Sequence, residues 1–126
     1  MKEIQVVAAV IQNEHKEYLC CQRAENKSLA GYWEFPGGKI EINETAELAL
    51  KREIKEELNA NCNIKKFLGT TMYEYEFGRV ILNVYLCNLE EGKFNLIEHQ
   101  DSKWLNKQNL ANLKLAPADI PILNWL

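Results

Sequence analysis

Most of the chain alternates between short apolar, β-branched runs and polar turns, a pattern typical of β-strands joined by loops. The polar residues 13–16 separate the first two runs and predict a β-hairpin there. A mostly polar loop is expected at residues 24–31. The predicted strands cover residues 4–12, 18–23, 62–77, 80–89 and 101–105.

One segment, residues 46–58, has the spacing of a helix instead. Its apolar residues recur at every fourth position and would form one stripe that packs against a sheet. Thr45 is the expected N-cap, and Asn59 can adopt the left-handed conformation that ends a helix. A helical turn is expected within residues 105–113 and a C-terminal helix at 117–126. The stripe consists of Ala46, Leu50, Ile54 and Leu58.

The same helix is rich in carboxylates, with six glutamates between Gly38 and Ala60. On a helix that turns about 100° per residue, Glu53, Glu56 and Glu57 fall within an arc of roughly 100°. Like charges at this spacing repel one another, and oxygen ligands suit Mg²⁺ or Mn²⁺, so the arc predicts a metal site. The alternative is an amphipathic helix with a solvated acidic face. Ala49 falls within the arc, where its small side chain would leave room for metal and substrate.

A short apolar strand interrupted by Pro-Gly-Gly precedes the helix, at residues 33–38. Paired glycines let the backbone turn sharply and approach a ligand closely. Backbone N–H groups in such a loop can hold a phosphate oxygen, and backbone carbonyls can ligate a cation. A glycine loop followed by an acidic helix therefore suits a metal–polyphosphate, although an ordinary turn explains Pro-Gly-Gly alone equally well.

Together these residues resemble the Nudix box, G-x5-E-x7-R-E-U-x-E-E-x-G-U, in which U is a bulky apolar residue. Gly38, Glu44 and residues 52–57 match its spacing and all its charged positions. Asn59 stands where the box has Gly, and Ala60 stands where it has a larger apolar residue. Asn is the best substitute for Gly in a left-handed cap, so the helix end should survive.

The resemblance extends over most of the chain, to MutT-type nucleoside triphosphate pyrophosphohydrolases and to bacterial CTP pyrophosphohydrolases. Residues 34–41 are very similar to the MutT-type segment, and residues 115–121 are more similar to the CTP-type enzymes. The resemblance implies an α/β fold: a Nudix-type α/β/α sandwich with a mixed β-sheet, one catalytic helix after the Gly-Gly loop, and a C-terminal helix.

Composition agrees with one globular domain over residues 1–126. The net charge of −3 and the lack of a basic, aromatic patch argue against nucleic-acid binding. No run of about 18 apolar residues and no convincing signal peptide are present, so no membrane association is expected. The four cysteines lack CxxC spacing, which argues against zinc and favours free thiols in a reducing cytoplasm.

The chemistry and the resemblance together predict the metal and catalytic residues. The cofactor should be Mg²⁺, for which Mn²⁺ can substitute. Glu53 can also act as the general base, with another carboxylate of the cluster as the alternative. Arg52 should orient Glu53, and Glu44 should have a supporting role. The loop carboxylate of Glu98 aligns with one that reaches the metal site in MutT-type enzymes, whereas His99 is expected to be a structural or surface residue. The predicted ligands are the Gly37 carbonyl, Glu53, Glu56, Glu57 and Glu98.

Substrate contacts are predicted from the same comparison. Arg23 resembles a family contact to the substrate phosphates, and Phe35, with Ile4 or Val6, could wall an apolar slot for the base. Asp119 stands where MutT-type enzymes have Asn; an ionised Asp only accepts hydrogen bonds, which suits the exocyclic amine of cytosine or adenine. A protonated Asp119 could still read 8-oxoguanine, and a helix-capping role is the alternative. The predicted substrate-binding residues are Arg23, Glu34, Phe35, Gly37, Gly38 and Asp119.

The expected reaction is hydrolysis of a nucleoside triphosphate to a monophosphate and pyrophosphate by a cytoplasmic monomer or weak homodimer. Its role would be to remove modified nucleotides, with 8-oxo-dGTP and cytosine nucleotides (CTP, dCTP or 5-substituted dCTP) as candidate substrates. One alternative is a Nudix hydrolase of another diphosphate. The other is a non-catalytic nucleotide-sensing module, against which the intact carboxylate set argues.

Overall fold

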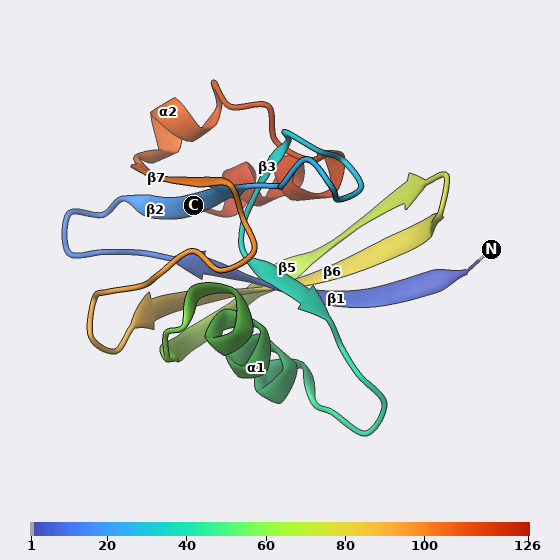
Figure 1. Ribbon diagram of the computed structural model, residues 1–126, viewed down its shortest axis with the longest axis horizontal. Coiled ribbons are helices and arrows are strands. Elements are labelled where there is room, and N and C mark those ends of the chain that lie inside the picture. The colour runs from blue at the N-terminus through green and yellow to red at the C-terminus, as the bar shows by residue number, and fades with distance from the viewer. Residues whose placement is uncertain (1) are drawn as a thin grey trace.

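The computed structural model describes residues 2–126, in which two β-sheets are packed between helices (Figure 1). The strands are β1 (Glu3–Ile11), β2 (Tyr18–Gln22), β3 (Trp33–Glu34), β4 (Gly37–Lys39), β5 (Cys62–Tyr75), β6 (Gly78–Leu89) and β7 (Asp101–Leu105). The helices are α1 (Ala46–Leu58), α2 (Lys107–Leu110) and the 3₁₀-helix η1 (Pro117–Trp125). All five predicted strands outside the glycine loop are present.

The larger sheet has the strand order β4-β1-β6-β5 and is mixed, because β1 and β6 run parallel while the other neighbours are antiparallel. The smaller sheet, β3-β2-β7, is antiparallel. Phe35 and Pro36 carry the chain from β3 in the small sheet to β4 in the large one. Glu34 and Gly37 therefore end up on different sheets that face one cleft.

The hairpin predicted between residues 4–12 and 18–23 is wrong. β1 pairs with β4 at Val6–Ala8 and with β6 along Glu3–Ile11, whereas β2 pairs with β3 and β7 in the small sheet. Only an isolated bridge between Gln12 and Tyr18 joins the two strands before β2 enters the small sheet. The turn itself is local, with the Asn13 side chain accepting the N–H groups of His15 and Glu17.

Both faces of the large sheet are covered, as in a sandwich. Figure 1 shows α1 on one side of the strands, with α2 and η1 on the other. Val7, Ala9 and Ile11 of β1 point toward α1, whereas Ala8 and Val10 pack with the other cluster, which includes residues of α2 and η1. This two-sided burial explains why β1 reads as a continuous apolar run rather than as an alternating strand.

The signals for the helix ends are confirmed. The Thr45 side chain accepts the Leu48 N–H, and Asn59 is left-handed (φ 49°), with its N–H bonded to the Lys55 carbonyl. The apolar stripe packs on β1, and Leu50, Ile54 and Leu58 are fully buried. Ala49 is also fully buried in this cluster, so the expectation that it leaves room for metal and substrate is wrong. The helical periodicity of the sequence does not show how much of the helix surface the sheet and the loop after β6 cover.

The C-terminal helix is present, but it is a 3₁₀-helix. Pro121 has no N–H with which to form an α-helical bond to Pro117, four residues earlier. Trp125 packs on Gly69 of β5 so closely that a Cβ there would meet its ring at 2.9 Å. Within residues 2–126, no helix is long and apolar enough to span a membrane.

Candidate active site

The three clustered carboxylates project from the second half of α1. The Glu53 and Glu57 side chains are only 16% and 6% exposed, whereas Glu56 is 53% exposed. Glu57 is buried because backbone bonds hold the loop after β6 over the helix end, including one from the Ile97 N–H to the Glu57 carbonyl. The arc predicted from the sequence therefore lies along the boundary between the core and a cleft.

The two glycines of β4 bring the backbone against this helix. A Cβ at Gly38 would collide with the Glu53 carboxylate, and one at Gly37 would collide with the Val7 carbonyl. Gly37 lies opposite Ala8, between the bonded positions of the antiparallel ladder, so its C=O does not pair with β1. That carbonyl is consequently available to a ligand beside Glu53.

Arg52 contacts several carboxylates of the site at once. Its Nε and Nη2 bind the two oxygens of Glu44 at 2.7 and 2.9 Å, and its Nη1 lies 2.8 Å from Glu53 and 3.3 Å from Glu56. Nη2 also donates to the Lys39 carbonyl at 2.9 Å. Hydrogen bonding to Arg52 lowers the pKa of Glu44 to about 2. Glu44 therefore holds the Arg52 side chain, which in turn contacts Glu53 and Glu56.

The surroundings of Glu57 disfavour its charged form. Burial, followed by its hydrogen bond with Glu53 and the negative charges of Glu34, Glu53 and Glu98, raises the Glu57 pKa well above its usual value. Its Oε2 atom is buried and has no hydrogen-bond partner among residues 2–126. A buried, unpaired carboxylate oxygen among other carboxylates is costly unless a cation neutralises it.

The carboxylate and carbonyl groups gathered here fit a hard divalent cation, because all the possible ligand atoms are oxygens and one of them, Glu57 Oε2, has no hydrogen-bond partner among the described residues. No three Asp, Glu, His or Cys side chains in the described part of the chain already form a metal-binding group. Arg52 pairs with Glu53 and Glu56, whereas the Glu57 carboxylate lies 3.6 Å from His99. The exposed Glu98 lines a small pocket of about 130 Å³ together with Glu53 and Glu57.

A cleft of about 850 Å³ begins at this acidic end and changes character along its length. Glu53, Glu56 and Arg52 line the acidic end. Ile4, Val6 and Phe35 line the other, where the aromatic rings of Tyr75 and Phe77 stack with centroids 5.1 Å apart. A cleft with one charged and one apolar, aromatic end suits a molecule that carries both a polyphosphate and a flat base.

Asp119 lies at the apolar end and is 5% exposed. It does not cap η1; instead its Oδ2 accepts the Phe35 N–H at 2.9 Å. Burial, and then the negative charge of Glu34, raises its pKa well above the usual value. The Ala118 N–H donates to the Tyr75 hydroxyl, and the Thr71 hydroxyl donates to the Ala118 carbonyl. Tyr75 and Thr71 therefore fix the segment that holds Asp119.

Arg23 and Glu34 form the wall shared by the cleft and the small pocket. Arg23 Nη1 contacts both Glu34 oxygens at 3.0 and 3.2 Å, while its Nε and Nη2 hold the Ser28 carbonyl and hydroxyl. His99 approaches from the loop after β6 and lies 2.9 Å from Glu34. All the site residues predicted from the sequence thus border one continuous depression or, like Glu44, support it.

Two features of this site were not predicted from the sequence. Of the two alternatives for His99, the surface position is wrong, because its side chain is 5% exposed and lies between Glu34 and Glu57. Tyr75 and Phe77 were included only within a predicted strand. Their i, i+2 spacing, which places both rings on one face, was the available signal.

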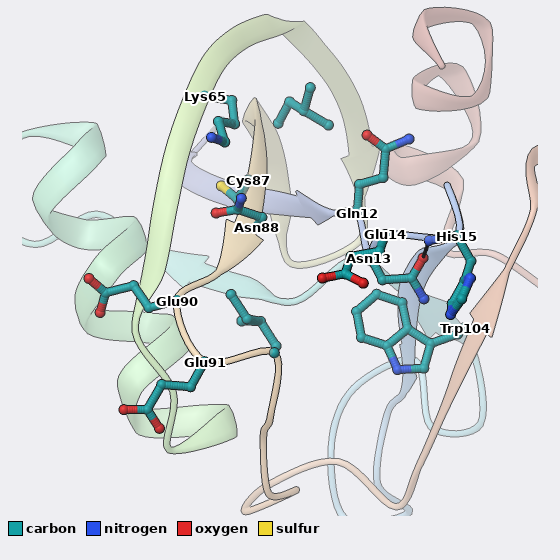
Figure 2. Close-up of a pocket in the computed structure, with 13 residues that line it drawn as sticks. Gln12, Asn13, Glu14, His15, Lys65, Cys87, Asn88, Glu90, Glu91 and Trp104 are labelled. Atoms are coloured by element: carbon teal, nitrogen blue, oxygen red, sulfur yellow. Dashed lines mark hydrogen bonds between the residues drawn. The ribbon is translucent and has the colours of Figure 1, made fainter.

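A second hollow of about 790 Å³ lies elsewhere, between the turn after β1 and the end of β6 (Figure 2). It shares no residue with the cleft. Its acidic residues Glu14, Glu90 and Glu91 are exposed, and Figure 2 shows Glu90 and Glu91 pointing away from the other side chains. This hollow lacks the buried, crowded carboxylates that distinguish the cleft.

The match to known families agrees with this geometry. The model of the NUDIX domain matches residues 2–126, so the chain belongs to this family of hydrolases, whose members act on small nucleotide substrates and generally use a divalent metal. The mixed sheet and the placement of its helices also match Nudix structures. The family predicted from the box is therefore confirmed.

The chain is similar over nearly its whole length to the following three proteins. The CTP pyrophosphohydrolase of Escherichia coli is 38% identical over 98% of this chain and 90% of the relative. The 8-oxo-dGTP diphosphatase of the same organism is 32% identical over 98% of this chain and 95% of the relative. A solution structure of the DNA mismatch repair protein MutT from methicillin-resistant Staphylococcus aureus is 46% identical, with a TM-score of 0.78, and the match covers 98% of this chain and 94% of that one.

Proposed function

We propose that this chain is a Mg²⁺-dependent nucleoside triphosphate pyrophosphohydrolase that releases a nucleoside monophosphate and pyrophosphate. The observation that carries the proposal is the cleft itself, in which the Glu53, Glu56 and Glu57 helix borders one end and Asp119 is buried at the other. The names of the two Escherichia coli relatives support the same reaction class.

The metal would be held by oxygens only. The unpaired Gly37 carbonyl and the orphaned Glu57 oxygen support their assignment as ligands, and Glu53, Glu56 and Glu98 complete the set around them. When bound, the cation neutralises phosphate charge and lowers the pKa of a bound water. Mg²⁺ is the first choice for an oxygen-only set, and Mn²⁺ can replace it.

Glu53 is proposed as the general base. Its carboxylate rests on Gly38 and is held by Arg52 Nη1, and Arg52 is itself fixed by the two-point pair with Glu44. An oriented carboxylate can take the proton of a water molecule whose oxygen attacks phosphorus. Arg52 and Glu44 thus act by holding Glu53.

The nucleotide would lie along the cleft from the acidic to the aromatic end. Arg23 and the backbone of Gly37 and Gly38 border the phosphate region, while Glu34 lies between phosphates and base. Phe35 forms part of the floor of the base slot. Asp119 uses one carboxylate oxygen for the Phe35 N–H, which leaves the other for the base.

The protonation of Asp119 separates two classes of base. As a carboxylate it accepts a hydrogen bond from the exocyclic amine of cytosine, which corresponds to the named activity of one relative. As a neutral acid it can donate to a carbonyl oxygen of an oxidised purine, which corresponds to that of the other. The raised pKa makes the neutral form accessible. Removal of modified nucleotides from the precursor pool, by a cytoplasmic monomer or weak homodimer, is the proposed role.

The test is pyrophosphate release with Mg²⁺ on 8-oxo-dGTP, dGTP, CTP, dCTP, 5-methyl-dCTP and dATP, compared as kcat/KM. A higher kcat/KM for cytosine nucleotides supports an ionised Asp119, and a higher kcat/KM for 8-oxo-dGTP supports the neutral acid. Activity on none of them refutes the proposal and directs attention to other diphosphates or to a sensing role. Omission of the metal should abolish turnover on every nucleotide.

A further inference from the structure

The loop between β6 and β7 is fastened to two elements of the site by backbone hydrogen bonds. The Asn95 and Ile97 N–H groups donate to the carbonyls of Leu58 and Glu57 at 2.8 and 2.9 Å, and the Gln100 N–H donates to Gln22 at 3.0 Å. The first two bonds satisfy carbonyls that the last turn of a helix leaves free. As a result, the residue just before Gln100 is held in a fixed position between α1 and β2.

That residue is His99, whose ring bridges the metal side and the substrate side of the site. Its side chain is 5% exposed, and its Nε2 lies 2.9 Å from Glu34 Oε2 and 3.6 Å from Glu57 Oε1. Its Nδ1 is buried and has no hydrogen-bond partner among residues 2–126. A carboxylate paired with Arg23 can only accept, so the 2.9 Å contact requires the ring hydrogen on Nε2.

Glu34 connects His99 to Arg23, the residue proposed to contact the substrate phosphates. The same Glu34 carboxylate that receives His99 holds Arg23 Nη1, and the other donors of Arg23 are held by Ser28. A continuous chain of hydrogen bonds therefore runs from His99 through Glu34 and Arg23 to Ser28. Arg23 and Glu34 line both the cleft and the small pocket. This series of hydrogen bonds therefore sets the position of the Arg23 guanidinium in the wall between the two.

We propose that His99 is a positioning residue that fixes Glu34 through its Nε2–H, and through Glu34 fixes Arg23 for the nucleotide. Without His99, the half-buried Glu34 carboxylate loses one of its two partners and can turn toward Glu57 or away from Arg23. The inference rests on the proposed function, because it takes Arg23 to be a contact of the nucleotide. It assigns no metal-binding role to His99.

The test compares two substitutions of similar size. Leu removes the donor and fills the space, whereas the side-chain amide of Gln can replace the Nε2–H. His99→Leu should raise KM roughly tenfold, change kcat by less than about threefold, and leave the affinity of the nucleotide-free protein for Mn²⁺ unchanged. His99→Gln should return KM to within about threefold of the wild type, which a purely structural role would not predict. His15→Leu, in the exposed turn after β1, is the matched control.

Three outcomes would overturn the proposal. A KM for His99→Leu equal to that of the wild type would show that Glu34 needs no tether. Equal damage by Leu and Gln would indicate that the ring merely fills space. Loss of Mn²⁺ binding, with a collapse of kcat, would place His99 on the metal side of the site instead.

Two further measurements separate this inference from the proposed function. Affinity for a non-hydrolysable nucleotide with a methylene bridge reports on Arg23 without turnover, and it should fall in His99→Leu but not in His15→Leu. The chain has only two histidines, so nitrogen-resolved NMR of their rings distinguishes them, and the His99 Nε2–H signal should shift in Glu34→Gln. An inactive wild type refutes the proposed function, whereas unchanged analogue affinity in His99→Leu refutes the inference.

Discussion

Arg52 and Glu44 form a two-point ion pair, with Arg52 Nε and Nη2 at 2.7 and 2.9 Å from the two carboxylate oxygens. The pair spans eight residues and fixes the loop before α1 to the middle of the helix. Arg52 also holds Glu53 at 2.8 Å, so the orientation of the proposed base depends on this guanidinium. A planar fork with several donors makes these contacts at once, which a lysine cannot do.

Arg52→Lys should therefore keep the charge but lose the geometry. We expect kcat/KM for pyrophosphate release to fall about 10- to 100-fold, the usual cost of losing a partner that orients a ligand. Arg79→Lys is the control, because Arg79 pairs with Glu3 and Glu74 on the surface and is not among the residues that line the cleft. Full activity in Arg52→Lys would contradict the orienting role.

Glu57→Gln should cut turnover at least about 100-fold, since even partners of metal ligands cost 10- to 100-fold. Without metal, the variant should melt at a higher temperature than the wild type, because a buried carboxylate is removed from the neighbourhood of Glu34, Glu53 and Glu98. Added Mg²⁺ should stabilise the wild type but not the variant. Glu47→Gln, an exposed residue in the first turn of α1, is the control, and near-normal turnover in Glu57→Gln would refute the metal assignment.

Gly38→Ala should impair catalysis more than stability. The added Cβ collides with the Glu53 carboxylate, which is the flexible end of a side chain and can move aside. A displacement of about 1 Å can cost roughly 100-fold in rate, while the melting temperature should change little. In Glu53→Gln, which already lacks the base, Gly38→Ala should have a much smaller further effect. Additive losses in the double variant would argue against this contact as the cause.

Asp119→Asn should change how stability depends on pH. The folded protein holds the Asp119 pKa well above its usual 3.8, so above that pH the folded state binds more protons than the unfolded state. The stability that Asp119 contributes is therefore complete below about pH 3.8 and is lost as the pH rises. Denaturant unfolding should show the free energy of unfolding of Asp119→Asn increasing relative to that of the wild type as the pH rises above about 4. A difference that stays constant with pH would contradict this.

The family, the acidic helix and both ends of that helix could be predicted from the sequence. Local signals carry this information: the spacing of the box, the side chain of Thr45 as N-cap and the left-handed preference of Asn59 all act within a few residues. The strands were also readable, because apolar runs between polar turns report directly on burial.

Which elements pair and which polar groups meet depends on contacts between distant parts of the chain, and these are visible only in the folded protein. The hairpin failed because β1 pairs with β4 and β6 while β2 pairs with β3 and β7 in the other sheet, which no local pattern reveals. Ala49 lies on the predicted acidic arc but is buried, since the width of the buried face depends on what packs over the helix. His99 acquired its place for the same reason: contact with Glu34, 65 residues away in sequence, arises from the folded chain and not from periodicity.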